Sequence, residues 1–286
     1  MGSRVDELET QTAVDVTHMT HAQMTGFIAK MGVRLRTILI RWIGLVFNLR
    51  GILHTYRLVP FILQWRRLAS RSRIAVPASD LYPCLTDATL KTGFDPHYFF
   101  QAAWLARKLA ARQPRVHTDI GSDVGMVGVM SAFVPVEFLD IRPLDVALTG
   151  LVSRSDNLSS LILPSDSVSS LSCLHVLEHV GLGRYGDPLD PDGHVKGAGE
   201  LSRVLAYGGD LYVSVPVGRE RVCFNAHRVF SVATVRKLFS NLDLSEFALV
   251  DDSGRFEPKM DASAAESYEY ACGLFHFVKR RGAASV

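Results

Sequence analysis

The sequence predicts a doubly wound, mostly parallel α/β sheet that follows a basic helical arm. Short apolar segments alternate with segments of helical periodicity between residues 116 and 279. One of them, His117–Gly125, has the form of a strand that runs into a tight glycine turn. Strands that alternate with helices form parallel sheets covered on both faces, and such sheets bind ligands where a strand ends in a turn.

Composition agrees with a folded chain. The 286 residues are 48% hydrophobic and 21% charged, which argues against disorder and suits one large domain, or one domain with an appendage. The cysteines lie far apart and form no CxxC pair, which favours a reducing compartment over a thiolate metal site: Cys84, Cys173, Cys223 and Cys272. Met1–His18 lacks the apolar run of a signal peptide, so we expect a cytoplasmic protein.

The arm, residues 1–79, has an uneven charge. No acidic residue occurs between Val16 and Ser79, whereas ten basic residues do. Arg34, Arg41 and Asn48 recur every seven positions on a mostly apolar helix. Pro60 is expected to break the pattern, and a second basic helix is predicted over Phe61–Arg71.

Two interpretations of this arm remain open. Its helices can pack on the catalytic domain or on a sister subunit of a homo-oligomer. They can instead lie on a membrane surface, because basic amphipathic helices are attracted to anionic lipid. The apolar run Trp42–Leu49 is too short to span a bilayer, which needs about 20 residues. Nucleic acid is not an expected partner, because aromatic and basic residues do not alternate here as in a stacking platform.

Residues 80–286 are predicted to form the main domain, after a turn-rich linker over Pro77–Pro96. The predicted strands are Val116–Ile120, Val136–Asp140, Ser169–His175, Leu211–Val215, Ser245–Asp251 and Tyr270–Lys279. The predicted helices are His97–Arg112, Met126–Phe133, Pro143–Leu148, Val195–Ala206 and Ser231–Phe239, and a turn is expected at Tyr207–Gly209.

The glycine turn carries two informative acids. Asp140 ends the next strand, at the distance where an acidic side chain accepts hydrogen bonds from both ribose hydroxyls of a nucleoside. Asp123 puts a carboxylate in the loop that would have to hold a pyrophosphate, which it would repel. S-adenosylmethionine carries a sulfonium and an ammonium group and no phosphate. The pair therefore favours S-adenosylmethionine over a dinucleotide.

Four segments resemble the successive motifs of class I S-adenosylmethionine-dependent methyltransferases: His117–Gly125, Glu137–Asp140, Leu174–His179 and Gly208–Pro216. Gly181–Gly193 and Phe224–Arg228 are similar to one subfamily, long catalogued as a bacterial and nematode domain of unknown function. The resemblance covers roughly Leu81–Lys279 and implies a seven-stranded, Rossmann-like methyltransferase fold. Asp123 replaces the middle glycine of the usual loop.

The resemblance also implies roles for individual residues. Asp119, Gly121, Ser122 and Gly125 are expected to line the methionine end of the cofactor, together with His175. Asp140 and Ile141 are expected to hold the ribose and one face of the adenine, and Asp156 and Asn157 to meet the adenine amino group. Tyr98 and Gln101 are candidates to cover the cofactor. Ser122 can also serve simply as a helix cap, and Asp156 as a turn residue.

Methyl transfer to a hydroxyl gains from a general base, a role that histidine fills most readily. His179 and His227 are the leading candidates, with Glu178 beside the first; an orienting role for His179 remains an alternative. The long loop Gly181–Gly193 is a candidate acceptor-binding lid. Expected acceptor contacts are Tyr98, Arg184, Tyr185, Asp187, Asn225 and Arg228. No metal site is predicted, although the loop carboxylates leave Mg²⁺ open.

The sequence therefore predicts a methyltransferase that acts on oxygen, with a hydroxyl of a saccharide or glycolipid precursor as the acceptor. The saccharide follows from the polar, carboxylate-rich loops around the expected pocket. Two alternatives remain: a lipid or quinone methyltransferase recruited to the membrane by the arm, and a binding module that keeps the fold without catalysis.

Overall fold

The computed structural model describes residues 55–262 and 267–280. The chain divides into two compact units, Met1–Gly93 and Phe94–Val286, and each is considered by itself. The expected helix with Arg34, Arg41 and Asn48 lies outside the described residues.

The described part of the first unit, residues 55–93, contains the amphipathic helix α4 (Leu58–Ala69), preceded by η2 (Thr55–Arg57) and followed by η3 (Ala78–Asp80). Pro60 does not break the helix, as the sequence had suggested, but lies in its first turn. There the backbone N–H groups have no partner within the helix, so a proline costs no hydrogen bond. No helix among the described residues is long and apolar enough to cross a membrane.

The second unit is built on an eight-stranded sheet of order β3-β2-β1-β4-β5-β10-β8-β9. Its strands are β1 (His117–Ile120), β2 (Val136–Asp140), β3 (Leu151–Ser155), β4 (Val168–Leu174), β5 (Leu205–Val217), β8 (Asp243–Val250), β9 (Phe256–Glu257) and β10 (Ala271–Val278). Strands β3, β2, β1, β4 and β5 pair in parallel, whereas β10 is antiparallel to both β5 and β8. The predicted mostly parallel α/β sheet is confirmed. The strand beyond the expected seven is β9, which pairs with β8 at the edge.

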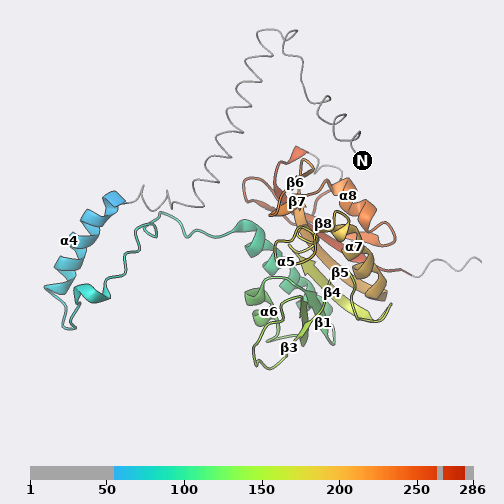
Figure 1. Ribbon diagram of the computed structural model, residues 1–286, viewed down its shortest axis with the longest axis horizontal. Coiled ribbons are helices and arrows are strands. Elements are labelled where there is room, and N and C mark those ends of the chain that lie inside the picture. Colours follow the sequence, from blue (N-terminus) through green and yellow to red (C-terminus); the bar gives the residue numbers. More distant parts are fainter. Residues whose placement is uncertain (1–54, 263–266, 281–286) are drawn as a thin grey trace, which may run out of the picture. The chain divides into compact units, whose positions relative to one another are not determined.

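Helices cover both faces of this sheet (Figure 1). Helices α5 (Pro96–Arg112) and α6 (Val124–Met130) bury Trp104, Leu105 and Met126 in one apolar cluster. Helices α7 (Gly193–Val204) and α8 (Val232–Leu238) bury Leu201 and Val235 in the other. A small hairpin of β6 (Arg221–Cys223) and β7 (His227–Val229) follows β5. The arrangement is the doubly wound one that the alternation of elements predicts.

Two local predictions are wrong. The expected helix Pro143–Leu148 is irregular chain, whose Leu144 N–H donates to the Ser153 hydroxyl (2.8 Å), and it leads into the unforeseen strand β3. The expected turn Tyr207–Gly209 lies within β5, which begins directly after α7. A register shift between β4 and β5 accommodates these glycines, and the Gly208 N–H donates to the Lys279 carbonyl (2.6 Å).

Candidate functional site

A pocket lies at the carboxyl edge of the parallel strands. It has a volume of about 210 Å³, and residues that follow each of four strands line it. These are Gly121 after β1, Asp140 and Ile141 after β2, Asp156 and Asn157 after β3, and His175 and His179 after β4. The loop before α7 adds Gly181, Tyr185, Asp187, Pro188 and Asp190. Ligands bind at this edge in open α/β sheets.

The turn after β1 is held by hydrogen bonds between its own side chains and backbone N–H groups. The Asp119 carboxylate accepts from the Ser122 N–H (3.0 Å), and the Ser122 hydroxyl accepts from the Leu174 N–H (3.0 Å). Asp123 caps α6 by accepting from the Met126 N–H (2.9 Å). Asp119, Ser122 and Gly125 therefore shape the turn and do not line the pocket, whereas Gly121 does.

Beneath this turn, a polar network is buried between β1 and β4. Ser172 donates its hydroxyl hydrogen to Asp119, and the His117 ring contacts the Ser170 and Ser172 hydroxyls at 2.8 Å each. Burial raises the pKa of Asp119 to about 6, against the opposing hydrogen bonds from Ser172 and Ser122. Burial also lowers the pKa of His117 to about 3. Both groups therefore favour their neutral forms, Asp119 up to about pH 6.

Asp140 after β2 and Asp156 after β3 border the pocket, and each carboxylate already accepts hydrogen bonds from backbone N–H groups. The Asp140 carboxylate accepts from the Arg142 N–H (2.7 Å), and its other oxygen faces Gly121, at 3.3 Å from where a β-carbon would lie. Asp156 accepts from the Asn157 N–H (2.7 Å) and the Ile162 N–H (3.2 Å). The turn role foreseen for Asp156 is therefore present, together with a position in the pocket wall.

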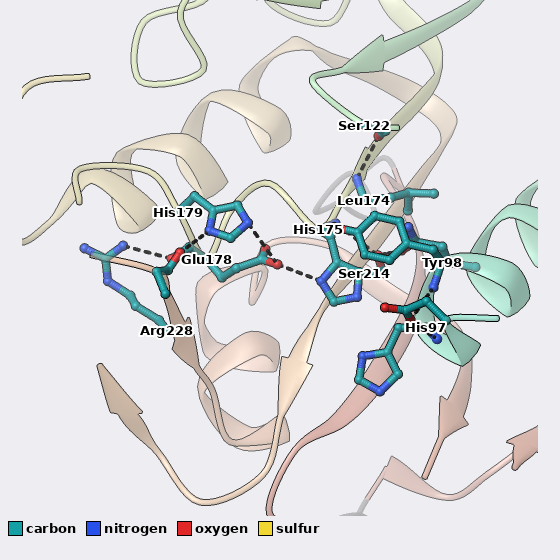
Figure 2. Close-up of polar contacts among 12 residues, drawn as sticks. His97, Tyr98, Ser122, Leu174, His175, Glu178, His179, Ser214 and Arg228 are labelled. Carbon is teal, nitrogen blue, oxygen red and sulfur yellow. Dashed lines mark hydrogen bonds and ion pairs between the residues drawn. The ribbon is translucent and has the colours of Figure 1, made fainter. Parts of the chain in front are cut away.

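His175 and Glu178 form a buried pair after β4 (Figure 2). Their Nδ1 and Oε1 atoms are 2.7 Å apart, and the two side chains are 6% and 1% exposed. Burial alone would lower the pKa of His175, but Cys272 and Glu178 raise it well above its usual value. Burial opposes ionisation of Glu178, and His175 nevertheless lowers its pKa. The opposite pKa shifts reflect the short contact that joins the two side chains.

Residues of α5 surround the His175 ring. Figure 2 draws the rings of Tyr98 and His97 on either side of it, with ring centroids 5.4 and 5.7 Å away. The Gln101 Oε1 accepts from the Ser214 hydroxyl (2.6 Å), and this hydroxyl accepts from the backbone N–H of His175 (3.1 Å). Tyr98 and Gln101 thus contact or support His175, and neither lines the pocket.

His179 also lines the pocket, and its Nε2 lies 3.5 Å from an Arg184 guanidinium nitrogen and 3.7 Å from the Glu178 carboxylate. Its Nδ1 lies 2.6 Å from the Ala226 carbonyl and donates to it, which leaves the lone pair on Nε2. Burial lowers the pKa of His179, against the opposing effect of Glu178, so the ring is neutral near pH 7. Arg184 also donates to the Ala226 carbonyl (3.1 Å). The Tyr185 ring meets the His179 ring edge to face, at 5.6 Å between centroids.

The loop 181–193 is internally braced. Asp187 accepts from the Gly181 N–H (2.7 Å) and the Tyr185 N–H (3.2 Å), while Asp190 pairs with Lys196 (2.5 Å). These contacts involve two of the three loop carboxylates, those of Asp187 and Asp190. Among the described residues, only a different group of His and Cys donors is arranged for a metal ion.

Three expected site residues lie elsewhere. Arg228 is 6% exposed, and its guanidinium donates to backbone carbonyls, the closest that of Val180 (2.7 Å), so it ties the loop to β7. Asn225 is exposed in the hairpin turn, and His227 packs beside Tyr270, with centroids 5.2 Å apart. None of the three lines the pocket.

Sequence reasoning missed Arg142, which lines the pocket and lies over the Tyr185 ring, 4.4 Å from its centroid. The only available signal was its place two residues after Asp140, at the end of a strand. Val176 and Val180, which add apolar surface, follow β4 within the motif already singled out.

The comparisons with known proteins concern this same unit. The model of a family described as "Caenorhabditis protein of unknown function, DUF268" matches residues 162–266. A search of curated proteins finds no match. The matched residues run from just before β4 to beyond β9 and include the loop that forms one wall of the pocket.

Three of the solved structures to which this chain is similar illustrate the level of likeness. The complex of the Haloferax volcanii Trm112 methyltransferase activator with a putative methyltransferase matches at 16% identity and a TM-score of 0.46, over 65% of this chain and 92% of that one. The YcgJ protein of Bacillus subtilis matches at 15% and 0.46, over 64% and 100%. The N-methyltransferase NodS of Bradyrhizobium japonicum, in complex with S-adenosyl-L-homocysteine, matches at 14% and 0.44, over 65% and 88%.

Proposed function

We propose that this protein is an S-adenosylmethionine-dependent methyltransferase. The observation that carries the proposal is the placement of two carboxylates at the turn after β1. Asp140 faces Gly121 inside the pocket, and Asp123 occupies the N-terminus of α6. A sulfonium or ammonium group is attracted by such surroundings, and a ribose finds its acceptor in Asp140.

The same geometry argues against a dinucleotide. Dinucleotide-binding folds place the pyrophosphate on the free N–H groups of the helix after β1. In this chain the Asp123 carboxylate already accepts from the Met126 N–H, so an anion would meet a negative charge at that point.

The residues beside the pocket also fit a polar ligand. Gln101 Nε2, His175 Nε2 and Glu178 Oε2 are buried and have no hydrogen-bond partner within the described chain. Buried polar atoms are nearly always paired, so a cluster of three unpaired atoms supports a ligand site. Gly121, Asp140, Ile141, Asp156 and Asn157 would hold the nucleoside part of S-adenosylmethionine, whose sulfonium would supply an electrophilic methyl group.

Calorimetry with S-adenosylmethionine and, separately, with NAD⁺ tests this proposal. We expect the first to bind and the second not. Asp140→Asn should lower the affinity about 10- to 150-fold, because a charge-assisted hydrogen bond is worth about 1.5–3 kcal/mol. Asp145→Asn, an exposed carboxylate outside the pocket, is the matched control and should bind like the parent. Binding of NAD⁺ alone, or of neither ligand, would overturn the proposal.

We further propose that the acceptor is a hydroxyl oxygen of a saccharide or glycolipid precursor. Its support is the polar wall made by the loop 181–193, where Tyr185 and Asp187 line the pocket and Arg184 lies beside His179. His179 Nε2 would take the hydroxyl proton. Incubation of a cell extract with the protein and methyl-labelled S-adenosylmethionine tests this: a labelled O-methyl saccharide is expected, and label on nitrogen or on no small molecule contradicts it.

A lipid or quinone acceptor at a membrane is the second candidate, and α4 favours it. Leu63 and Leu68 of this helix are 61% and 60% exposed, and Arg66 and Arg67 lie in its last turn. Flotation with anionic liposomes separates the candidates. Loss of flotation in Leu63→Glu/Leu68→Glu, with retention in the matched Ile74→Glu variant outside the helix, would support membrane docking. Absence of the parent protein from the liposome fraction would dismiss it.

A further inference from the structure

Two histidines and a cysteine from distant parts of the chain meet beside the pocket. His97 lies at the start of α5, His175 follows β4, and Cys272 is the second residue of β10. One donor atom from each lies within 4.8 Å of the other two. His175 also lines the pocket, and the other two residues do not.

The hydrogen bonding of His175 is that of a metal ligand. Its Nδ1 lies 2.7 Å from the Glu178 carboxylate and donates to it, while its buried Nε2 has no hydrogen-bond partner. Histidines that bind metals almost always donate their second N–H to a carboxylate or carbonyl, which fixes the ring and strengthens the ligand. Here both ring and carboxylate are nearly inaccessible, at 6% and 1% exposure.

The fold holds the other two donors in place. Asp95 caps α5 and accepts from the His97 N–H (2.9 Å), so the first turn of the helix presents His97 beside the His175 ring. Because β10 is antiparallel to β5, its first residues lie at the carboxyl edge of the parallel strands, where Cys272 pairs with Pro216. Cys272 is fully buried, and it forms no disulfide.

We propose that His97, His175 and Cys272 bind a zinc ion. Zinc binds imidazole at about 2.0–2.1 Å and thiolate at about 2.3 Å in a tetrahedron, so its donor atoms lie about 3.5 Å apart. The donor atoms, all within 4.8 Å of one another, would move closer on binding, and the partly buried His97 ring, now stacked on His175 at 14° between planes, would turn its lone pair toward the ion. A thiolate and two imidazoles favour zinc over magnesium or calcium, which prefer oxygen.

Three protein ligands leave a fourth position open, as in catalytic zinc sites. A water, hydroxyl or thiol in that position would lose its proton at a lower pH than in solution, with no change in the oxidation state of the metal. If the protein is a methyltransferase as proposed above, the open position of the zinc ion places the acceptor heteroatom next to His175, at the border between the zinc site and the pocket. The zinc site itself requires no methyl transfer.

Metal binding to the full-length protein tests the site without any activity assay. After treatment with a chelator, the protein is titrated with Zn²⁺ against a chromophoric chelator, and with Co²⁺ while its absorption spectrum is recorded. We expect one Zn²⁺ per chain and a near-ultraviolet band from the thiolate–cobalt bond. His97→Asn and Cys272→Ser should weaken Zn²⁺ binding about 100-fold or more, since even residues behind the ligands cost about 10–100-fold. Cys272→Ser should also abolish the band.

Cys223→Ser is the matched control, because Cys223 is half-buried and outside the cluster. It should retain both affinity and band. Glu178→Gln, acting through His175, should weaken Zn²⁺ binding about 10–100-fold while the cobalt band remains. If Cys272→Ser does not fold, the His97→Asn variant still tests the zinc site, because His97 is partly exposed. Equal Zn²⁺ affinity in the parent and in His97→Asn, or no thiolate–cobalt band in the parent, would overturn the zinc site and leave the methyltransferase proposal standing.

Discussion

His117 and Asp119, two residues apart on β1, share the hydroxyl group of Ser172 on β4. Ser172 donates to Asp119, so its oxygen accepts the Nε2 hydrogen of His117 (2.8 Å). The other ring nitrogen then accepts from the Ser170 hydroxyl (2.8 Å). The network thereby assigns the His117 tautomer and holds the strand that ends in the glycine turn.

Ser172→Ala should destabilise the protein more than Ser170→Ala does. The first change leaves two buried groups, Asp119 Oδ2 and His117 Nε2, without a partner, at about 1–3 kcal/mol each. The second leaves only His117 Nδ1 without one. Urea unfolding measures both free energies. Equal losses would show that water or a shifted side chain replaces the missing hydroxyl.

The two serine variants should also differ in pH dependence. The folded pKa of Asp119, about 6, exceeds the usual 3.8, so its contribution to stability is present at low pH and is lost as the pH rises through 6. Ser172→Ala removes a hydrogen bond to the carboxylate and raises that pKa further. The free energy of unfolding lost in Ser172→Ala should therefore be greater at pH 8 than at pH 5, by about 1.4 kcal/mol for each unit by which the pKa of Asp119 rises.

The pKa of His117 makes stability depend on pH in the opposite sense. Its folded pKa of about 3 lies below the usual 6.5, so its contribution is present above pH 6.5 and is lost as the pH falls toward 3. The ring is still neutral at pH 5 in the folded state, and Ser170→Ala should cost the same at pH 5 and pH 8. A larger loss at pH 8 in Ser170→Ala would contradict this assignment.

Gly181→Ala should open the loop that walls the pocket. At Gly181, φ is +79° and a β-carbon would lie 2.1 Å from the Asp190 carbonyl oxygen, which is backbone. Strain of about 1–2 kcal/mol adds to an overlap cost of about 1–3 kcal/mol. Gly186→Ala, in the same loop at φ +87° with open space around it, should show the strain alone. Urea unfolding and protease cleavage within 181–193 compare the two, and equal behaviour would show that the loop yields freely.

Arg228→Lys should loosen the same loop from the other side. The nearly buried guanidinium donates to the Val180 carbonyl (2.7 Å) and lies 3.4–3.5 Å from those of Glu178, Asp190 and Pro191. A lysine keeps the charge but cannot fan out to several acceptors. We expect a loss of about 2–3 kcal/mol, against almost none for the exposed Arg236→Lys. Thermal unfolding with no difference between the variants would assign Arg228 a minor role.

Strand ends could be predicted from sequence because their pattern is local. Gly121, Asp140 and His175 each end or follow an apolar run, and parallel strands bring such positions to one edge. The structure of residues 141–150 could not be predicted from such a local pattern. Its apolar residues suggested a helix, whereas a hydrogen bond to Ser153 and the positive φ of Gly150 hold it as irregular chain before β3.

Contacts between residues far apart in the chain could not be predicted from the sequence. Asp119 is absent from the pocket lining and is hydrogen-bonded to Ser172 in the neighbouring strand. The burial of Arg228 depends on carbonyls of the loop it holds. Cys272 meets His97 only because β10 runs antiparallel to β5, and no spacing in the sequence signals it.

His179 and His227 can now be separated as candidate bases. His179 lines the pocket and carries its ring hydrogen on Nδ1, whereas His227 lies outside the pocket beside Tyr270. His179→Asn is the decisive variant, because the asparagine amide can still donate to the Ala226 carbonyl while the Nε2 lone pair is lost. If His179 is the base, turnover should fall about 100- to 10,000-fold, and His227→Asn should change it less than tenfold. If His179 only orients the loop, His179→Asn should turn over S-adenosylmethionine as the parent does.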